Sequence, residues 1–210
     1  MPEARPPRFV IFDWGGVFSL KPPGASRRAF ERSLGLESGT LGGFFREDSW
    51  VQVSTGRQNE DDFWAAVCAG FPVPPGPDAA ARLWSHLFLH GLVRRSVVEM
   101  ATRLRAHATV SLLSNAAPSL REVIAPLLPI FTDVVISAEV GLRKPDPEIF
   151  HLALERLGAR PEEVLFVDDF QHNIAAAAAL GIRGHRFLTP ARLRMALERH
   201  GLPQATRMFA

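Results

Sequence analysis

The sequence of 210 residues has a single cysteine, no tyrosine and almost no net charge. One cysteine, Cys68, excludes an intramolecular disulfide and suits a reducing compartment. The 24 basic and 22 acidic residues give a formal charge of only +2, which does not indicate the clustered basic face of a nucleic-acid-binding protein. No apolar run approaches the length that spans a bilayer, and the N-terminus lacks a secretory signal pattern. We therefore expect a cytoplasmic protein without membrane or nucleic-acid partners.

Short apolar runs alternate with amphipathic helical patterns over most of the chain. Strands are expected at 9–12, 109–113, 134–136, 164–167 and 184–187. Helices are expected at 96–107, 119–128, 147–157, 173–180 and 190–200. This alternation predicts an α/β fold with a Rossmann-like, doubly wound parallel sheet.

The segment between the first strand and the helix at 96–107 has no strand pattern. Helical spacing occurs instead at 26–34, in the segment that follows Asn59, and at 78–90. Residues 20–92 are therefore predicted to form an all-α domain, inserted into an α/β core domain made of residues 1–19 and 93–210. The sequence does not decide between a monomer and a homodimer.

Polar side chains follow the predicted strands at the points where these strands end. The strand-end residues are Asp13, Ser114, Asn115, Asp168 and Asp169, and Lys144 lies in the loop after the strand at 134–136. Each of them alone is more often a turn, cap or solvated loop residue. Ligands of parallel α/β sheets bind outside the carboxyl ends of the strands, so these residues should converge there. Three acids close together favour a cation between them, and ligation by oxygen alone suits Mg²⁺ completed by a substrate phosphate.

Four segments resemble, in their order and spacing, the four motifs of the haloacid dehalogenase superfamily. They are 12–17 (FDWGGV), 112–115 (LLSN), 141–150 (GLRKPDPEIF) and 166–173 (FVDDFQHN). The resemblance covers essentially the whole chain, including a helical cap after the first strand, and is strongest to small sugar-phosphate phosphatases and to the phosphatase domain of soluble epoxide hydrolase. It implies a Mg²⁺-dependent phosphohydrolase that acts on small phosphorylated metabolites such as sugar phosphates.

The resemblance also implies the residues that perform the chemistry. Asp13 would be the nucleophile that attacks phosphorus and forms an aspartyl-phosphate, which water then hydrolyses. Asp13, Asp169 and the main-chain carbonyl of Gly15 would bind Mg²⁺.

The remaining motif residues would support that centre and contact the substrate. Ser114 and Asn115 would hydrogen-bond the transferring phosphoryl group, and Lys144 would offset its charge. Asp168 and Asn173 would hold Asp169, the metal-bound waters or Lys144.

One position departs from the pattern of most phosphatases in the superfamily. They carry a second Asp two residues after the nucleophile as general acid and base, a group worth roughly 10²–10⁴-fold in rate. This sequence has Gly15 there. A phosphatase for a good or self-protonating leaving group, such as a sugar 1-phosphate, is the favoured interpretation.

A 2-haloacid dehalogenase and a catalytically silent phosphate-binding protein are the alternatives. A dehalogenase of this superfamily needs neither a leaving-group acid nor a metal, and the retained pair Asp168–Asp169 counts against it. Retention of Asp13, Lys144 and Asp169 together counts against the silent protein.

Overall fold

The computed structural model describes residues 5–20, 24–33, 35–40, 43, 48–69 and 93–202. The strands are β1 (Phe9–Phe12), β2 (Thr109–Ser114), β3 (Val134–Ile136), β4 (Val164–Asp168) and β5 (Arg183–Arg186). The α-helices are α1 (Gly24–Ser33), α3 (Asp48–Ser54), α4 (Glu60–Ala69), α6 (Arg95–Leu104), α7 (Leu120–Val123), α8 (Ser137–Val140), α9 (Pro147–Leu157), α10 (Gln171–Ala179) and α11 (Pro190–Arg199). A π-helical turn, η1, spans Trp14–Phe18, and two 3₁₀ turns are η2 (Ala125–Ile130) and η3 (Pro161–Glu163).

The five strands form one parallel sheet in the order β3-β2-β1-β4-β5. β1 is central and alternates its side chains between two apolar clusters, with Val10 and Phe12 on one face and Phe9 and Ile11 on the other. A strand buried on both faces needs a continuous apolar run, which is what the sequence has there. The predicted doubly wound α/β sheet is confirmed.

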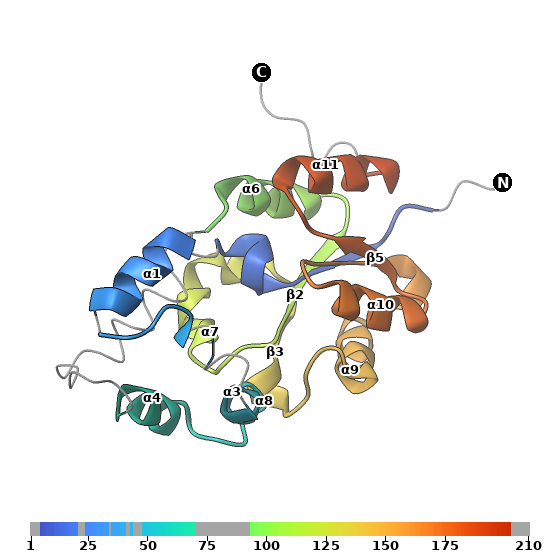
Figure 1. Ribbon diagram of the computed structural model, residues 1–210. Coiled ribbons are helices and arrows are strands. Elements are labelled where there is room, and N and C mark those ends of the chain that lie inside the picture. The colour runs from blue at the N-terminus through green and yellow to red at the C-terminus, as the bar shows by residue number, and fades with distance from the viewer. Residues whose placement is uncertain are drawn as a thin grey trace.

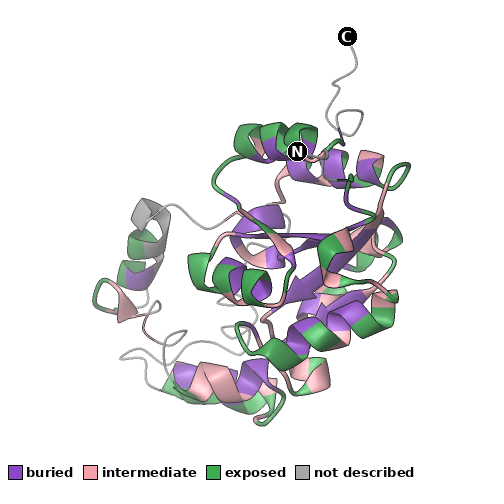
Figure 2. Cartoon of the chain, turned by 90° about the vertical axis from the view of Figure 1, so that its right-hand side faces the viewer, coloured by how far each residue is buried: buried purple, intermediate pink, exposed green. Residues whose placement is uncertain are grey.

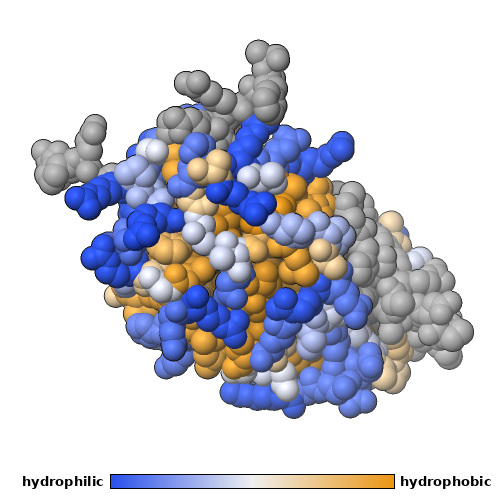
Figure 3. All heavy atoms as spheres, turned by 180° about the vertical axis from the view of Figure 1, so that it is seen from behind, coloured by the Kyte–Doolittle hydropathy of each residue, from blue (hydrophilic) through white to orange (hydrophobic). Residues whose placement is uncertain are grey.

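Helices cover both faces of the sheet (Figure 1). The cluster on one face takes in buried residues of α6 and α11, and the cluster on the other takes in those of α9 and α10. Figure 2 shows the buried strands between helices whose outer sides are exposed. In the view from behind, apolar residues occupy the middle of the face with hydrophilic residues around them (Figure 3).

Between β1 and α6 the described residues form helices and turns but no strand. Asn59 begins α4 by accepting hydrogen bonds at Oδ1 from the main-chain N–H groups of Asp61 (2.8 Å) and Asp62 (3.3 Å). Phe63 and Trp64 of α4 are buried, as the helical pattern predicts. The expected helix at 78–90 lies outside the described residues.

The chain leaves the sheet and returns to it at neighbouring points. Ser19 and Val93 form an isolated antiparallel bridge, and the N–H of Arg94 donates to the carbonyl of Phe18 over 2.7 Å. The two ends of the helical segment are therefore held side by side at the edge of the α/β fold.

One predicted helix is divided in the structure. The expected helix at 119–128 consists of α7, which ends at Val123, and the 3₁₀ turn η2, which contains Pro126 and Pro129. Proline has no N–H for an α-helical hydrogen bond, so the α-helix cannot continue through Pro126.

No helix in the described ranges has the length and apolar character to cross a membrane.

Candidate active site

The strand-end residues predicted from the sequence lie at the carboxyl edge of the sheet. Asp13 follows β1 directly, Ser114 is the last residue of β2, and Asp168 is the last residue of β4. β1 is paired with both β2 and β4, which brings these three side chains to adjacent positions. All three are buried, Asp168 completely.

Lys144 lies at the centre of this group with its ammonium fully hydrogen-bonded. Nζ donates to Asp13 Oδ1 (2.7 Å), to Asp168 Oδ2 (2.8 Å) and to the carbonyl of Leu113 (2.8 Å). It also lies 5.4 Å from the centroid of the Phe166 ring. A lysine has three donors, so every one is used inside the protein. The residue is only 2% exposed although it comes from a loop between α8 and α9.

Asn115 fixes the main chain of that loop. Its Nδ2 donates to the carbonyl of Lys144 (2.7 Å), and its Oδ1 accepts from the N–H of Lys144 (2.8 Å). The side-chain amide of Asn115 thus hydrogen-bonds both the N–H and the carbonyl of Lys144, as the main chain of a neighbouring strand would. The phosphoryl contact expected of Asn115 stays a prediction, and the structure adds a positioning contact to Lys144.

Asp168 is held in place by three donors besides the sheet. Its Oδ2 accepts from Lys144 and from Nδ2 of Asn173 (2.9 Å), and its Oδ1 accepts from the N–H of Phe170 (2.8 Å). These bonds fix the carboxylate between Lys144 and the start of α10. The Asp168 carboxylate therefore has a fixed orientation, and through it Asp168 positions Lys144.

Three carboxylates converge where a cation could sit. One oxygen from each of Asp13, Asp168 and Asp169 lies within 4.8 Å of the other two. Three carboxylates against the one ammonium of Lys144 leave two excess negative charges (three minus one). A divalent cation would balance that charge, and the all-oxygen donor set suits Mg²⁺. The residues present therefore fit the metal that the sequence predicts.

Burial and charge set the protonation of the central pair. Burial raises the pKa of Asp13 from 3.8 to about 6, with Lys144 opposing and Asp168 and Asp169 adding to the rise. Burial acts to lower the pKa of Lys144, but the carboxylates of Asp13 and Asp168 outweigh it and hold this pKa above its ordinary value. Lys144 is therefore a permanent cation beside an unusually basic carboxylate.

The turn η1 places Gly15 next to Asp13. A Cβ at Gly15 would lie 3.7 Å from Asp13 Oδ2, the only described atom within 4 Å outside Gly15 and its two chain neighbours. The backbone of Gly15 has φ −67°, which any residue adopts, whereas Gly16 has φ 79° and needs glycine. The ring centroids of Trp14 and Phe18 are 5.7 Å apart in a stacked arrangement and Trp14 is buried, so its side chain packs in the core.

Ser137 was not singled out from the sequence, although it follows β3 at the same edge. It is completely buried; its Oγ accepts from the N–H of Ala116 (3.0 Å) and donates to the carbonyl of Ser54 at the end of α3. The strand-end rule that selected Asp13 would have found it. Ser137 ties the inserted helical segment to the sheet.

Glu60 makes a second connection between the helical segment and the α/β fold. Its Oε1 accepts from Ser119 Oγ (2.6 Å) and from Trp64 Nε1 (3.2 Å), and its Oε2 accepts from the N–H of Ser119 (3.1 Å). No pattern in the sequence links α4 to the start of α7. Both tethers lie on the carboxyl side of the sheet and so border the site.

Comparison with known proteins gives a family match and several relatives. A family model for haloacid dehalogenase-like hydrolases matches residues 48–181, a stretch that contains Lys144 and Asp169 and begins after Asp13. Acyl-CoA dehydrogenase family member 10 of Mus musculus is 32% identical over 187 residues, covering 83% of this chain and 17% of that protein. Bifunctional epoxide hydrolase 2 of Mus musculus is 24% identical over 196 residues, covering 83% and 35%. Phosphoserine phosphatase of Thermus thermophilus is 39% identical over 88 residues, covering 40% and 35%. The chain thus spans about a third or less of each relative.

Solved structures share the fold. An enzyme of this family from Bacteroides thetaiotaomicron, in complex with magnesium and inorganic phosphate, superposes with TM-score 0.72 at 20% identity, covering 85% of this chain and 93% of that one. L-2-haloacid dehalogenase from Xanthobacter autotrophicus, with chloropropionic acid covalently bound, superposes with TM-score 0.61 at 23% identity, covering 91% and 82%. At these identities the likeness extends to the fold.

Proposed function

Because this chain belongs to the haloacid dehalogenase-like hydrolases, we propose that it is a Mg²⁺-dependent phosphohydrolase of small phosphorylated metabolites. The observation that carries the proposal is the buried cluster of Lys144 with Asp13 and Asp168, beside Asp169. A phosphatase among the relatives and a structural neighbour that holds magnesium and phosphate support it.

Asp13 is the nucleophile of the proposed reaction. Its carboxylate oxygen attacks phosphorus, the bond to the leaving alkoxide breaks, and the phosphoryl group is carried as an aspartyl-phosphate until water hydrolyses it. A carboxylate whose pKa is raised to about 6 is a better nucleophile than an ordinary one and is still mostly ionised at neutral pH. Asp13, Asp169 and the carbonyl of Gly15 would hold Mg²⁺, which when bound supplies positive charge for the phosphoryl oxygens.

Other residues orient the groups that react. Lys144 holds the Asp13 carboxylate through its 2.7 Å hydrogen bond, and its charge attracts the phosphoryl oxygens. Asn115 holds the main chain of Lys144, and Asp168 accepts a hydrogen bond from its ammonium. Asn173 in turn donates a hydrogen bond to Asp168. Ser114, at the end of β2, is the proposed hydroxyl contact to the phosphoryl group.

The leaving group must obtain its proton without an acid at Gly15. We therefore favour phosphate esters with a good leaving group, such as sugar 1-phosphates. The position itself has room for a Cβ, which within 4 Å would meet only Asp13 Oδ2, at 3.7 Å, among the described residues beyond its chain neighbours.

The domain division follows from the same proposal. Residues 1–19 and 93–210 make the α/β core, and 20–92 make a helical cap that covers the carboxyl edge. The bridge between Ser19 and Val93 supports a boundary at these two residues.

A dehalogenase is the second candidate, favoured by the structural likeness to L-2-haloacid dehalogenase. Asp13 would then displace halide from carbon, which needs neither a metal nor an acid at Gly15. The three converging carboxylates weigh against it, because their excess charge has no purpose without a cation. A silent phosphate-binding protein is the third candidate, and the tightly held nucleophile and lysine weigh against it.

A phosphate-release screen tests the proposal. Sugar phosphates and other small esters are incubated with the protein in Mg²⁺ and in EDTA, and the acid-quenched enzyme is examined by mass spectrometry for a phosphoryl group on Asp13. We expect turnover that EDTA and Asp13→Asn abolish and that Asp146→Asn, an exposed carboxylate, retains. Turnover unaffected by EDTA or by Asp13→Asn would refute the proposal. Halide release from 2-haloacids would establish the second candidate, and phosphate binding without turnover the third.

A further inference from the structure

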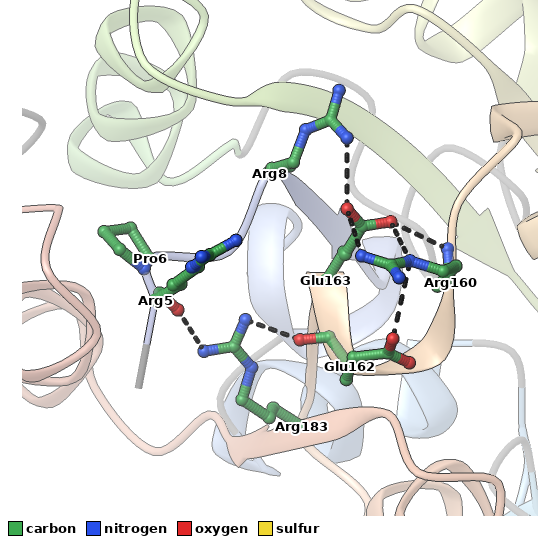
Figure 4. Close-up of a pocket in the computed structure, with 7 residues that line it drawn as sticks. All are labelled: Arg5, Pro6, Arg8, Arg160, Glu162, Glu163 and Arg183. Carbon is green, nitrogen blue, oxygen red and sulfur yellow. Dashed lines mark hydrogen bonds and ion pairs between the residues drawn. The ribbon is translucent and has the colours of Figure 1, made fainter. Parts of the chain in front are cut away.

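A hollow of about 520 Å³ lies at the opposite end of the sheet from Asp13 (Figure 4). Its lining residues are Arg5, Pro6, Arg8, Arg160, Glu162, Glu163 and Arg183. They precede β1, precede β4 and begin β5, so they gather at the amino ends of these strands. Nothing in the proposed hydrolysis uses this end of the sheet.

The two acids of the hollow are already occupied by two of its arginines. Arg8 donates to Glu163 over 3.0 Å, and Arg160 reaches the same carboxylate over 3.3 Å. Bonds from Arg160, followed by the one from Arg8, lower the pKa of Glu163 to about 2. Glu162 is 3.4 Å from Arg160. Both carboxylates of the hollow are thus paired with Arg160, and that of Glu163 is also paired with Arg8.

Arg183 carries a charge without a carboxylate partner among the described residues. Its two terminal nitrogens donate to main-chain carbonyls, of Arg5 (2.9 Å) and of Glu162 (2.8 Å). Its Nε is buried and has no hydrogen-bond partner in the described part of the chain. In Figure 4 the side chain of Arg5 extends between Arg8 and Arg183, with no marked interaction from its guanidinium.

We propose that this hollow, with its two excess positive charges (four arginines minus two glutamates), binds an oxyanion of the phosphate class. A dianion balances that charge, and guanidinium groups match phosphate oxygens with paired N–H donors. The volume falls within the roughly 300–1,000 Å³ of small-molecule sites, so a phosphate carried by a small metabolite also fits. The ligand approaches Arg5 and the terminal N–H groups of Arg183 that its two main-chain hydrogen bonds leave unused. The inference does not depend on the activity proposed for Asp13.

NMR of arginine side chains tests the site directly. The ¹⁵N-labelled full chain is titrated in EDTA with inorganic phosphate at an ionic strength held constant with sodium chloride, and the Nε–Hε signals are followed. Arg183→Lys assigns the Arg183 signal. We expect a saturable shift of that signal, and an affinity reduced roughly tenfold in Arg5→Ala, which removes one charge-assisted contact. Alkyl phosphonates distinguish the sources: tighter binding than phosphate indicates an organic ligand, and equal binding indicates free phosphate.

Arg5→Ala is the decisive variant, because Figure 4 marks no interaction between the Arg5 guanidinium and the other residues drawn there. Arg105→Ala removes an exposed arginine elsewhere and should leave the affinity unchanged. An Arg183 signal that phosphate does not move, or that chloride moves equally, overturns the proposal. So does an Arg5→Ala protein with undiminished affinity.

Discussion

Replacing Asp13 by Asn should make the protein more stable at neutral pH when no divalent cation is present. Burial raises the pKa of Asp13 from 3.8 to about 6, so the folded state binds an extra proton between these two values. Stability therefore falls as the pH rises through this window and stays low above it. At about 1.4 kcal/mol per pH unit, the ionised carboxylate costs ~3 kcal/mol. Asparagine resembles the protonated acid and escapes this cost.

Urea unfolding in EDTA, followed by tryptophan fluorescence, measures the effect. At pH 7.5 Asp13→Asn should exceed the wild type by ~3 kcal/mol in free energy of unfolding, and at pH 4 the difference should shrink to ~0.6 kcal/mol. Asp146→Asn makes the same chemical change at an exposed site and should alter stability by less than about 0.5 kcal/mol. An Asp13→Asn protein less stable than the wild type at pH 7.5, or a gap at pH 4 as large as the one at pH 7.5, would refute the reasoning.

Three further predictions concern the same cluster. Gly15→Asp should raise kcat for phosphate esters by roughly 10²-fold, because its carboxylate enters open space beside Asp13; measured kcat at or below the wild-type value contradicts this. Lys144→Met should lower the free energy of unfolding by about 3–5 kcal/mol, because Asp13 and Asp168 lose their buried counter-charge; a loss below about 1 kcal/mol in urea unfolding would show that the pair is solvated. Mg²⁺ should raise the thermal midpoint of the wild type but not of Asp169→Asn, and an equal rise in both proteins would remove Asp169 from the metal site.

The strands β1 to β4 were predictable because they are buried on both faces. The apolar run at 9–12 coincides with β1, and the run at 134–136 coincides with β3. Because both sides of such a strand are apolar, its residues form a continuous apolar run whose two ends mark the ends of the strand. The helix expected at 119–128 was wrong beyond Val123. The apolar periodicity of the segment continues past Pro126, but proline lacks the N–H that an α-helix needs there.

The site was predictable as a set of strand ends but not as a set of contacts. Sequence order places Lys144 in a loop, and its burial arises from Asp13, which is 131 positions away along the chain. The amide of Asn115 pairs with the backbone of Lys144 across 29 positions. Contacts of this kind depend on how the strands are ordered in space, which no local pattern encodes. The roles of the site residues stay predictions until the experiments above are done.

The bridge between Ser19 and Val93 has a consequence for how such a protein can change. The bridge joins the two ends of the helical segment. The segment therefore leaves the α/β fold and returns to it at neighbouring points, as a closed loop does. The entropy of closing a loop grows only logarithmically, so halving or doubling the segment changes stability by about 0.6 kcal/mol. A helical segment of different length and sequence could therefore replace this one between Ser19 and Val93. Substrate range could then diversify, by recombination or by design, while the sheet and its strand-end residues stay intact.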